Sequence, residues 1–292
     1  MSEPTGQTVI QALFRGEPLD RSSARTLNDR VVVSGLSLAG AIGAEPLAQL
    51  HHAEISAVHF DGCDFGRLRF FSCQLLNCTF QRCKFDNFRM WETILSRCEL
   101  TDCDLRGASM GGIGESGRRN ACRDVHFVRS NFQHLGFANC EFLRCLFFDC
   151  KLRHVNFDGS SFQDCVFKGV LKDVSFNQRS IPGIPLNEMQ NVDFREAQLR
   201  DVEFRRLNLF GVRLPSDEEH LIMSRDDMLF AITELSQSRK QSDKGLAEFL
   251  KGTLPWTVPD GPTFVAHKED LKDSCGEATL TELVRLLRLR RN

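Results

Sequence analysis

Apolar residues recur at every fifth position over most of this 292-residue chain. The longest uninterrupted series runs from residue 55 to residue 110 and consists of Ile55, Phe60, Phe65, Phe70, Leu75, Phe80, Phe85, Met90, Leu95, Leu100, Leu105 and Met110. A five-residue period fits neither an α-helix, with about 3.6 residues per turn, nor a strand, with about two. It fits a chain that turns a corner every five residues. Four sides then make a coil of about twenty residues, and successive coils stack as parallel strands about 4.8 Å apart.

A second column of small or apolar residues lies two positions before each of these centre residues. The pattern breaks twice and ends at Leu214, and weaker copies precede it from Val31 onwards. We therefore predict one coil over residues 31–215, interrupted by loops at 111–121 and 177–187.

Two five-residue units show the repeat most clearly: Cys103-Asp104-Leu105-Arg106-Gly107 and Val155-Asn156-Phe157-Asp158-Gly159. These units resemble those of the pentapeptide-repeat family, which read roughly (Ala/Cys/Ser/Val)-(Asp/Asn)-(Leu/Phe)-x-x. The resemblance covers residues 31–214. It implies a mainly β fold, a right-handed quadrilateral parallel β-helix, and the remaining sequence adds a C-terminal α-helical region.

The chain contains 12 cysteines, and all except Cys122 and Cys275 fall in the column before the centre residues. Residues twenty apart should stack, so Cys63, Cys83 and Cys103 are expected to form one ladder. A free cysteine behaves as a small buried hydrophobe, which suits this narrow inner position. Because a ladder does not converge on one point and no Cys-x-x-Cys pair exists, we predict packing rather than metal binding or redox chemistry. So many buried thiols indicate a reducing compartment, the cytoplasm.

The 24 phenylalanines follow the same spacing. We expect these core columns: Phe60 over Phe80, Phe65 over Phe85, and Phe127 over Phe147 over Phe167. The chain has no tyrosine. A tyrosine inside such a core would need a partner for its hydroxyl group, so its absence there agrees with a purely apolar interior.

The first loop contains Gly112-Ile113-Gly114-Glu115-Ser116-Gly117, which matches the dinucleotide fingerprint G-x-G-x-x-G. That fingerprint works only between a strand and a helix. The five-residue pattern resumes eight residues after Gly117, which leaves no room for a helix. We therefore predict a surface loop without a cofactor, and Arg118 and Arg119 are its candidate partner contacts.

Nothing else in the sequence forms a catalytic or metal-binding constellation. His134 and His154 are twenty positions apart and could stack on one outer corner, but two imidazoles alone make a weak metal site. The sequence contains no HExxH, GxSxG or Walker A motif. We predict a protein that is not an enzyme and has no catalytic, cofactor-binding or metal-binding residues.

Charge and hydropathy narrow the classes of partner. The chain carries 37 Lys+Arg against 39 Asp+Glu, a net charge of −2, which argues against direct nucleic-acid binding. No stretch approaches about twenty uninterrupted apolar residues, so no membrane span is expected. The first residues, Met1-Ser2-Glu3-Pro4, lack the basic and apolar regions of a Sec-type signal peptide.

A few outward positions carry apolar residues that the repeat does not require. Phe71 and Trp91 are twenty apart and should stack outside the coil, and Leu146 and Val166 form a similar pair. Exposed apolar patches of this kind mark contacts. Two occupants are open: the chain's own termini, which we prefer, and a partner protein.

Both ends of the chain depart from the five-residue period. Residues 1–30 are expected to hold a short helix at 8–14 and to act as a cap on the first coil or as a mobile targeting segment. Residues 216–292 are expected to form a separate helical module.

Three helices are predicted in this module. A capping box at 216–219 opens the first, the second spans 243–250, and the last spans 279–290. The last helix carries Arg285 and Arg288. We interpret it as a lid or a homodimer contact, and alternatively as a basic helix that docks on an acidic partner or a membrane surface.

Three functions fit these features. The first is a non-enzymatic protein–protein interaction scaffold. The second comes from the resemblance: the best-understood pentapeptide-repeat proteins are similar to duplex DNA in size and charge, bind type II topoisomerases such as DNA gyrase, and give resistance to quinolones or toxins. Their Qnr-type members have two projecting loops, but a DNA mimic needs an acidic surface, which a near-neutral coil does not offer. The third is a bacterial effector, exported without a Sec signal, whose coil presents the C-terminal module.

Overall fold

The computed structural model describes residues 12, 25–37 and 49–291. The N-terminal segment expected to hold a helix at 8–14 lies almost wholly outside these residues. The same is true of most of the weaker repeat copies after residue 37.

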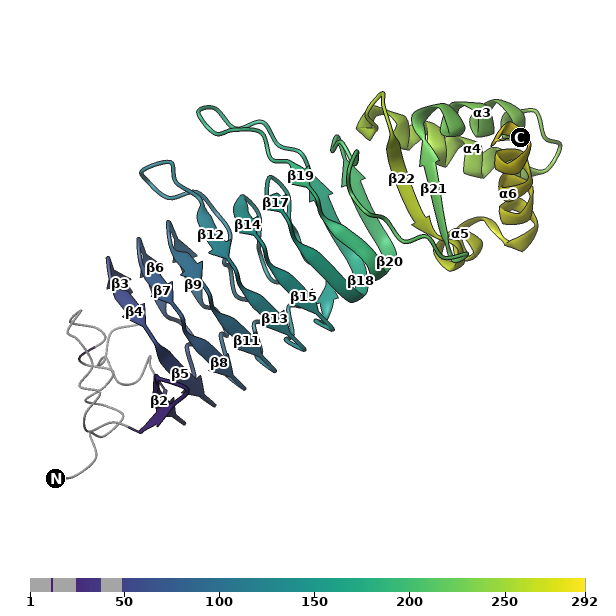
Figure 1. The fold of residues 1–292 in the computed structure, drawn as a ribbon. Coiled ribbons are helices and arrows are strands. Elements are labelled where there is room, and N and C mark those ends of the chain that lie inside the picture. Colours follow the sequence, from purple (N-terminus) through teal and green to yellow (C-terminus); the bar gives the residue numbers. More distant parts are fainter. Residues whose placement is uncertain (1–11, 13–24, 38–48, 292) are drawn as a thin grey trace.

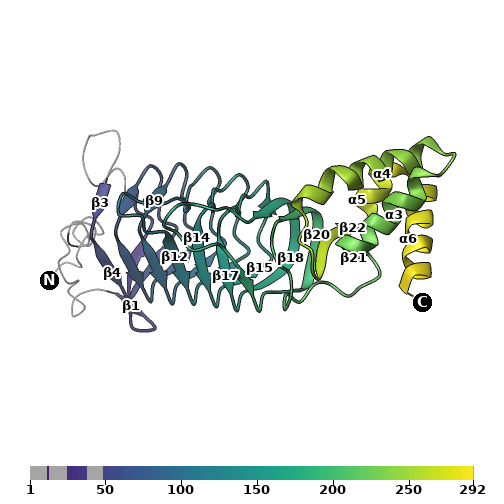
Figure 2. The same ribbon diagram turned by 90° about the horizontal axis from the view of Figure 1, so that it is seen from above.

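The chain winds into a right-handed quadrilateral parallel β-helix, which confirms the predicted fold class (Figures 1 and 2). One side is the sheet of β1 (Thr26–Leu27), β2 (Arg30–Ser34), β5 (Val58–Asp61), β8 (Thr79–Gln81), β11 (Glu99–Thr101), β13 (His126–Val128), β15 (Leu146–Phe148), β18 (Val166–Asn177), β16 (Leu152–Arg153) and β20 (Asp193–Arg205). All neighbours in it are parallel except β1 and β2.

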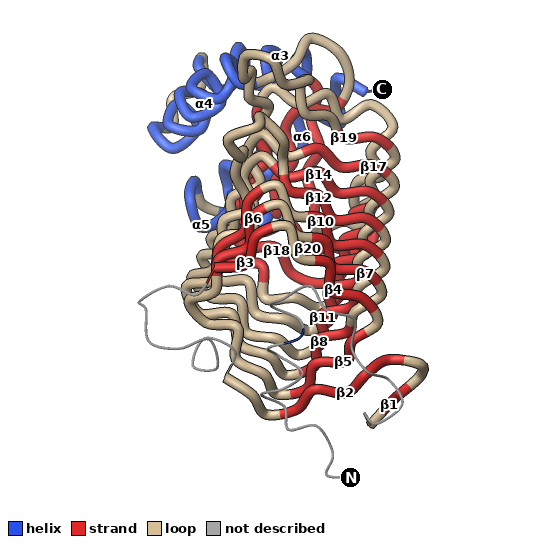
Figure 3. Tube along the Cα trace, turned by 90° about the vertical axis from the view of Figure 1, so that its left-hand side faces the viewer, coloured by secondary structure: helices blue, strands red, loops and turns tan. Residues whose placement is uncertain are grey.

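A second side is the sheet of β4 (Glu54–Ser56), β7 (Gln74–Leu76), β10 (Ile94–Ser96), β12 (Asn120–Arg123), β14 (Cys140–Leu143), β17 (Ser161–Gln163) and β19 (Met189–Gln190). The third side contains β3 (Gln49–His51), β6 (Arg69–Phe71) and β9 (Arg89–Trp91). The fourth is held by single bridges that link Asp64, Lys84 and Asp104. Figure 3 shows the coil obliquely, with the N-terminus at the bottom and these strands stacked in columns.

Partner residues in neighbouring coils are 20 positions apart in the regular part of the coil, as at β5, β8 and β11, and 19 apart at Leu152 and Leu171. Across the first loop Glu99 pairs with His126, and across the second Phe162 pairs with Met189, in both cases 27 positions away. Each loop therefore adds seven residues to one coil. The first loop, which we call loop 1, ends at residue 119 rather than 121 because β12 already begins at Asn120.

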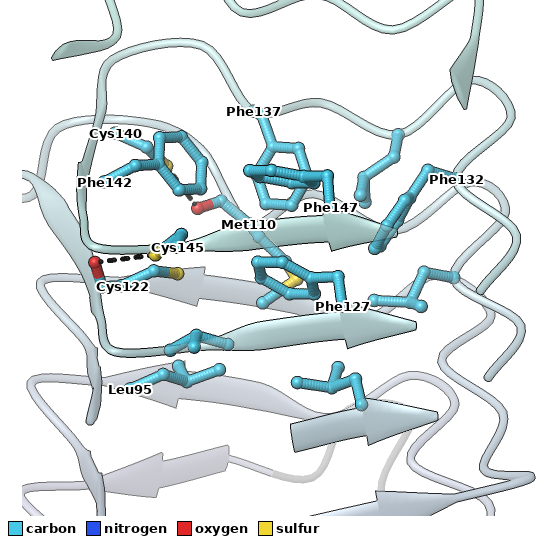
Figure 4. Packing of buried hydrophobic residues seen from close by; sticks show 14 of the residues in the cluster. Leu95, Met110, Cys122, Phe127, Phe132, Phe137, Cys140, Phe142, Cys145 and Phe147 are labelled. Atoms are coloured by element: carbon cyan, nitrogen blue, oxygen red, sulfur yellow. Dashed lines mark hydrogen bonds between the residues drawn. The ribbon is translucent and has the colours of Figure 1, made fainter. Parts of the chain in front are cut away.

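Phenylalanine rings fill the centre of the coil (Figure 4). Ring centroids twenty positions apart are separated by 5.1 Å for Phe60 and Phe80, 4.8 Å for Phe65 and Phe85, 4.8 Å for Phe127 and Phe147, and 4.5 Å for Phe147 and Phe167. None of these seven side chains is more than 5% exposed. Stacked and edge-on rings at such distances stabilise the core beyond the area they bury.

Cysteine side chains form the inner wall between these rings. The ladder of Cys63, Cys83 and Cys103 is fully buried. The Cys145 thiol donates a hydrogen bond to the carbonyl oxygen of Cys122 at 3.3 Å, as Figure 4 shows. Burial raises the pKa of the Cys150 thiol to about 12, so this group stays protonated and poorly nucleophilic at neutral pH.

Beyond residue 215 the chain forms a module at the C-terminal end of the coil (Figure 1). Its elements are β21 (His220–Ser224), α3 (Arg225–Ser236), α4 (Gln241–Thr253), a 3-10 turn (Leu254–Trp256), β22 (Pro262–His267), α5 (Lys268–Cys275) and α6 (Glu277–Arg291). The helices share an apolar core of their own that includes Met228, Leu250 and Leu283. No helix in the described part of the chain is long and apolar enough to cross a membrane.

The prediction of a helix that starts at 216–219 is wrong. The Asp217 carboxylate accepts the backbone N–H groups of Glu219 and His220, both at 3.0 Å, and the chain then continues as β21, antiparallel to β22. The capping box lies at Ser224 and Asp227, each of whose side chains accepts the backbone N–H of the other. Pairing with a strand about forty residues further along overrides the local helix signal.

Candidate interaction surfaces

An aromatic stripe runs along the outside of the coil. His51, Phe71 and Trp91 are the last residues of β3, β6 and β9, and each directly follows a buried centre residue. The ring centroids of His51 and Phe71 are 4.7 Å apart and those of Phe71 and Trp91 are 4.8 Å apart, with interplanar angles of 7° and 6°. Because the three strands pair in register, side chains at this position must stack on their equivalents. We call these three residues the aromatic stripe.

The aromatic stripe is open to solvent over part of its length. His51 is exposed, and Phe71 and Trp91 are half-buried. Loop 1 leaves the coil beside Trp91, since a Cβ atom on Gly112 would lie 3.8 Å from the indole ring. The C-terminal module lies at the opposite end of the coil, so this terminus does not cover the aromatic stripe (Figure 1).

Loop 1 is attached to the coil through Glu92, the residue after Trp91. The Glu92 carboxylate accepts the backbone N–H of Ser116 at 2.7 Å and the hydroxyl of Ser72 at 3.1 Å. The Arg118 guanidinium, which is otherwise exposed, lies 3.4 Å from the same carboxylate. Hydrogen bonds from the Ser116 hydroxyl and backbone N–H hold the pKa of Glu92 below its usual range.

The glycine motif of loop 1 does not form a nucleotide-binding turn. Ile113 and Arg119 form an antiparallel bridge, and β12 follows directly at Asn120. No helix begins after Gly117, so there is no helix N-terminus at which a pyrophosphate could bind. The glycines serve the turn itself, in which the N–H of Gly117 donates to the carbonyl of Gly114.

Arg119 is not the exposed contact residue that the sequence predicts, since it is only 9% exposed. Its guanidinium donates to the Ser161 hydroxyl at 3.2 Å and to the carbonyl of Pro185 at 2.8 Å, and burial lowers its pKa. Pro185 belongs to the second loop, which the sequence predicts at 177–187 and which lies between β18 and β19, at residues 178–188; we call it loop 2. Arg119 therefore ties loop 1 to loop 2, and the two loops project from the same side of the coil (Figure 1).

Two buried asparagines close the loops, and the sequence analysis missed both. The Asn120 amide donates to the carbonyls of Met90 and Met110, at 2.9 and 3.0 Å, and so joins the chain on both sides of loop 1. The Asn187 amide likewise donates to two carbonyls, those of Ser160 and Asn177, at 3.2 and 3.1 Å, and so spans loop 2. The signal that could have revealed them is a polar residue in the inner column directly after each break in the pattern.

The second outer apolar pair lies on a different side of the coil from the aromatic stripe. Leu146 and Val166 are paired residues of β15 and β18, and both are half-buried. Phe148, at the end of β15, is exposed beside them. The structure thus presents two separate apolar surfaces rather than one.

The basic residues of α6 divide into two groups. Arg285 forms an ion pair with Glu282 at 2.6 Å, and Arg288 is exposed. Arg290 and Arg291 instead turn back onto Asp227, in the first turn of α3, at 3.1 and 3.0 Å. The end of this helix is therefore held within the module, and only part of its charge faces outward.

Opposite charges alternate along two corners of the coil. Arg129 forms an ion pair with Asp102 at 2.8 Å, and Arg144 with Asp124 at 2.6 Å. Each such exposed pair contributes little to stability. Their effect on the surface is larger, because alternating charges prevent a continuous acidic face at these corners.

His134 and His154 stack at 5.0 Å on an outer corner. Among the described residues no three His, Cys, Asp or Glu side chains converge as a metal site would require.

Residues 73–112 match the family profile described as pentapeptide repeats, in eight copies. No curated protein sequence matches the chain. The solved structures similar to this chain include a trypsin-treated form of QnrB1, a plasmid-mediated fluoroquinolone resistance protein, at 15% identity, with 60% of this chain and 91% of that chain covered and a TM-score of 0.35. They also include HetL, a pentapeptide repeat protein involved in heterocyst differentiation regulation in the cyanobacterium Nostoc sp. strain PCC 7120, at 14% identity, with 73% and 93% covered and a TM-score of 0.38.

These structural likenesses are too distant to carry an argument about function. The repeat profile matches where the coil is most regular, in a segment whose strands pair every 20 residues. Residues 73–112 of this chain therefore consist of pentapeptide repeats.

Proposed function

We propose that this chain is a non-enzymatic protein–protein interaction scaffold, in which the coil presents the aromatic stripe and the adjoining loop 1 to a partner protein. The observation that carries the proposal is the stack of His51, Phe71 and Trp91 on the outside of a rigid sheet. Aromatic rings supply much contact area and lose little conformational freedom on binding. Here stacking already fixes the rings, so a partner would meet a preformed surface.

The groups that could do chemistry support a binding role. Eleven of the twelve cysteines are buried, and all twelve are free thiols. Burial keeps a thiol such as Cys150 protonated, so these residues serve packing. This set of free thiols also agrees with a reducing compartment such as the cytoplasm, where we place the protein.

The test uses the double variant Phe71→Ser/Trp91→Ser in the full chain. Tagged wild-type and variant proteins capture partners from lysate of the source organism, and Phe148→Ser, an exposed aromatic residue on another side, serves as the matched control. We expect the double variant to lose a partner that the control retains, with a similar melting temperature for both. Identical captured proteins for wild type and double variant would overturn the role of the aromatic stripe.

The two loops favour a second candidate function, binding to a type II topoisomerase. The alternating ion pairs on two corners do not supply the acidic face that DNA mimicry needs. A gyrase supercoiling assay with and without ciprofloxacin distinguishes the two functions. We expect neither inhibition nor protection at micromolar protein, and either effect would favour the topoisomerase.

The homodimer through the C-terminal helices stays a prediction. Leu229 on α3 and Leu289 on α6 are exposed apolar side chains that such a contact would cover. Sedimentation of the full chain would give a dimer if they do, and replacing Leu289 with Ser would then return the monomer.

A further inference from the structure

A groove of about 550 Å³ lies between the last strand of the coil and the C-terminal module. One wall is the C-terminal half of β20, and the other walls come from α4, the turn after it, β22 and α5. Concave sites of this volume are typical of small-molecule binding, whereas protein partners usually meet flatter surfaces. The size and form of the groove therefore suit a small ligand.

Aromatic side chains form much of the lining of this groove. Phe204, Phe249, Trp256 and Phe264 come from four different elements. Phe249 is 52% exposed and Trp256 is 38% exposed, although both are large apolar side chains. The Phe204 ring stacks on Phe176 with centroids 5.2 Å apart. Phe249 meets Phe264 edge-on at 6.3 Å. A ligand would therefore meet aromatic walls that are already in place, so that binding would not have to order them.

The charged groups of the lining are largely neutralised within the protein. Three of its four carboxylates form ion pairs: Glu203 with Arg205 at 2.6 Å, Glu248 with Lys251 at 2.6 Å, and Asp270 with Arg200 at 2.7 Å. Burial and the neighbouring Asp270 raise the pKa of the fourth, Asp201, so its surroundings disfavour a charge. Among the described residues that line the groove, the only basic one is Arg205, which is already paired. The groove therefore offers little to a charged ligand.

The hydroxyl groups of the lining are also satisfied within the protein. Those of Thr253, Thr257 and Ser274 donate to backbone carbonyls, at 2.8, 2.7 and 2.9 Å. The Thr263 hydroxyl accepts the backbone N–H of Val258 at 3.1 Å. A polar ligand would lose its hydration in the groove without gaining equivalent partners, which costs free energy. What remains for a ligand is mainly the apolar surface of the rings.

A glycine keeps part of the groove open. Gly252 lies on α4 and lines the groove, and a Cβ atom there would meet no other atom within 4 Å. Gly245, on the same helix, is equally unobstructed but does not line the groove. Glycine is among the least favourable residues inside a helix, so a larger residue at either position suits the helix itself. The two glycines therefore provide a matched pair of positions for a test.

We propose that this groove is a binding site for a neutral small molecule with a mainly aromatic skeleton. The rings of the ligand lie against Phe249 and Trp256 and remove their exposed faces from water. No ionic contact is needed, because the carboxylates of the lining have their cations within the protein. The site shares no residue with the aromatic stripe, so it holds or fails independently of the proposed partner binding.

Two matched dyes test the chemical class of the ligand. N-phenyl-1-naphthylamine is neutral and fluoresces more strongly in apolar surroundings, and it is titrated with the full chain. We expect saturable binding of one dye per chain, with an affinity that changes less than about twofold between low and high salt. The dye 1-anilinonaphthalene-8-sulfonate has the same rings and a sulfonate group, and it should bind at least about tenfold more weakly. Equal or tighter binding of the sulfonate would overturn a site for neutral ligands.

Variants on α4 locate the binding. Gly252→Leu places a side chain in the groove and should weaken binding of the neutral dye at least about tenfold, whereas Gly245→Leu should bind it as wild type does. Both variants should keep or raise the melting temperature, because leucine favours a helix more than glycine does, so lost binding would not reflect unfolding. Absence of saturable binding up to about 50 µM dye, or binding that Gly252→Leu leaves unchanged, would overturn the proposal.

Discussion

The inner coils and the last coil of this protein cover their aromatic rings and pair their backbone N–H groups in different ways. An inner coil is covered on both faces by neighbours with the same pattern, so each ring meets a ring and each strand meets a strand. The last coil has such a neighbour on one face only, and on the other it relies on His220, Asp270 and the carbonyl of Trp256. Inside the coil, repeated residues therefore pack on one another. At its end, the coil requires side chains that do not belong to the repeat.

The largest loss of stability is expected for a core residue that packs between two neighbouring coils. Phe147 stacks between Phe127 and Phe167 and is fully buried. Phe147→Ala leaves a cavity that neighbouring coils cannot fill and should lower the free energy of unfolding by about 3–5 kcal/mol. Chemical denaturation measures the change, and Phe210→Ala, at an 82% exposed position, should stay within about 0.5 kcal/mol of wild type. A loss below about 1 kcal/mol at Phe147 would contradict the account of the interior.

A smaller loss of stability is expected at the two loops that interrupt the repeat. Asn120→Ala removes two hydrogen bonds to backbone carbonyls and a third in which the Asn120 Oδ1 accepts the backbone N–H of Thr93 at 2.8 Å, so this buried N–H loses its partner. We expect a loss of about 3 kcal/mol, near the upper end for unsatisfied buried groups. Asn187→Ala is the matched variant at loop 2 and should lose a similar amount. If denaturation shows that either variant is as stable as wild type, that loop does not depend on its asparagine.

The five-residue spacing predicted the coil and its two interruptions because each coil interacts only with coils that carry the same pattern. It even contained a signal that the sequence analysis passed over. His51 lies 20 positions before Phe71 and completes the aromatic stripe. The spacing could not show that Arg119 is buried, because its partners come from loop 2, where no period relates the residues.

The C-terminal module was harder to predict, since its elements are fixed by distant contacts. The apolar residues 221–223 suit a helix or a strand, and only β22 decides between them. The strand β22 itself and α5 were missed, because the first lies among prolines and the second has only one buried apolar residue, Leu271. The groove depends on how this module sits against β20, which no local pattern encodes.

At the C-terminal end of the coil we expect a smaller loss of stability than at Phe147 or Asn120. His220→Ala removes the acceptor of the Leu199 N–H, a bond of 3.0 Å in a buried position. The free energy of unfolding should fall by about 2 kcal/mol, because the buried Leu199 N–H is left without a hydrogen-bond partner. His126→Ala, at an exposed position on an inner coil, is the control and should change little. Hydrogen exchange of the Leu199 amide would locate the effect, and unchanged protection there would show that the end does not rely on His220.

The smallest effect concerns loop 1 and depends on pH. The pKa of Glu92 is lowered in the folded protein by the Ser116 hydrogen bonds. A lowered carboxyl pKa stabilises the attached loop above the unfolded-state pKa of about 4.3, and this contribution is lost as the pH falls through the folded-state pKa. The Ser116 amide resonance should therefore titrate with a midpoint below about 4.3, the ordinary pKa of a glutamate. At neutral pH, Glu92→Gln should speed tryptic cleavage after Arg118, while Glu115→Gln should not. A midpoint at or above about 4.3 for the Ser116 amide would mean that Glu92 does not hold the loop through its charge.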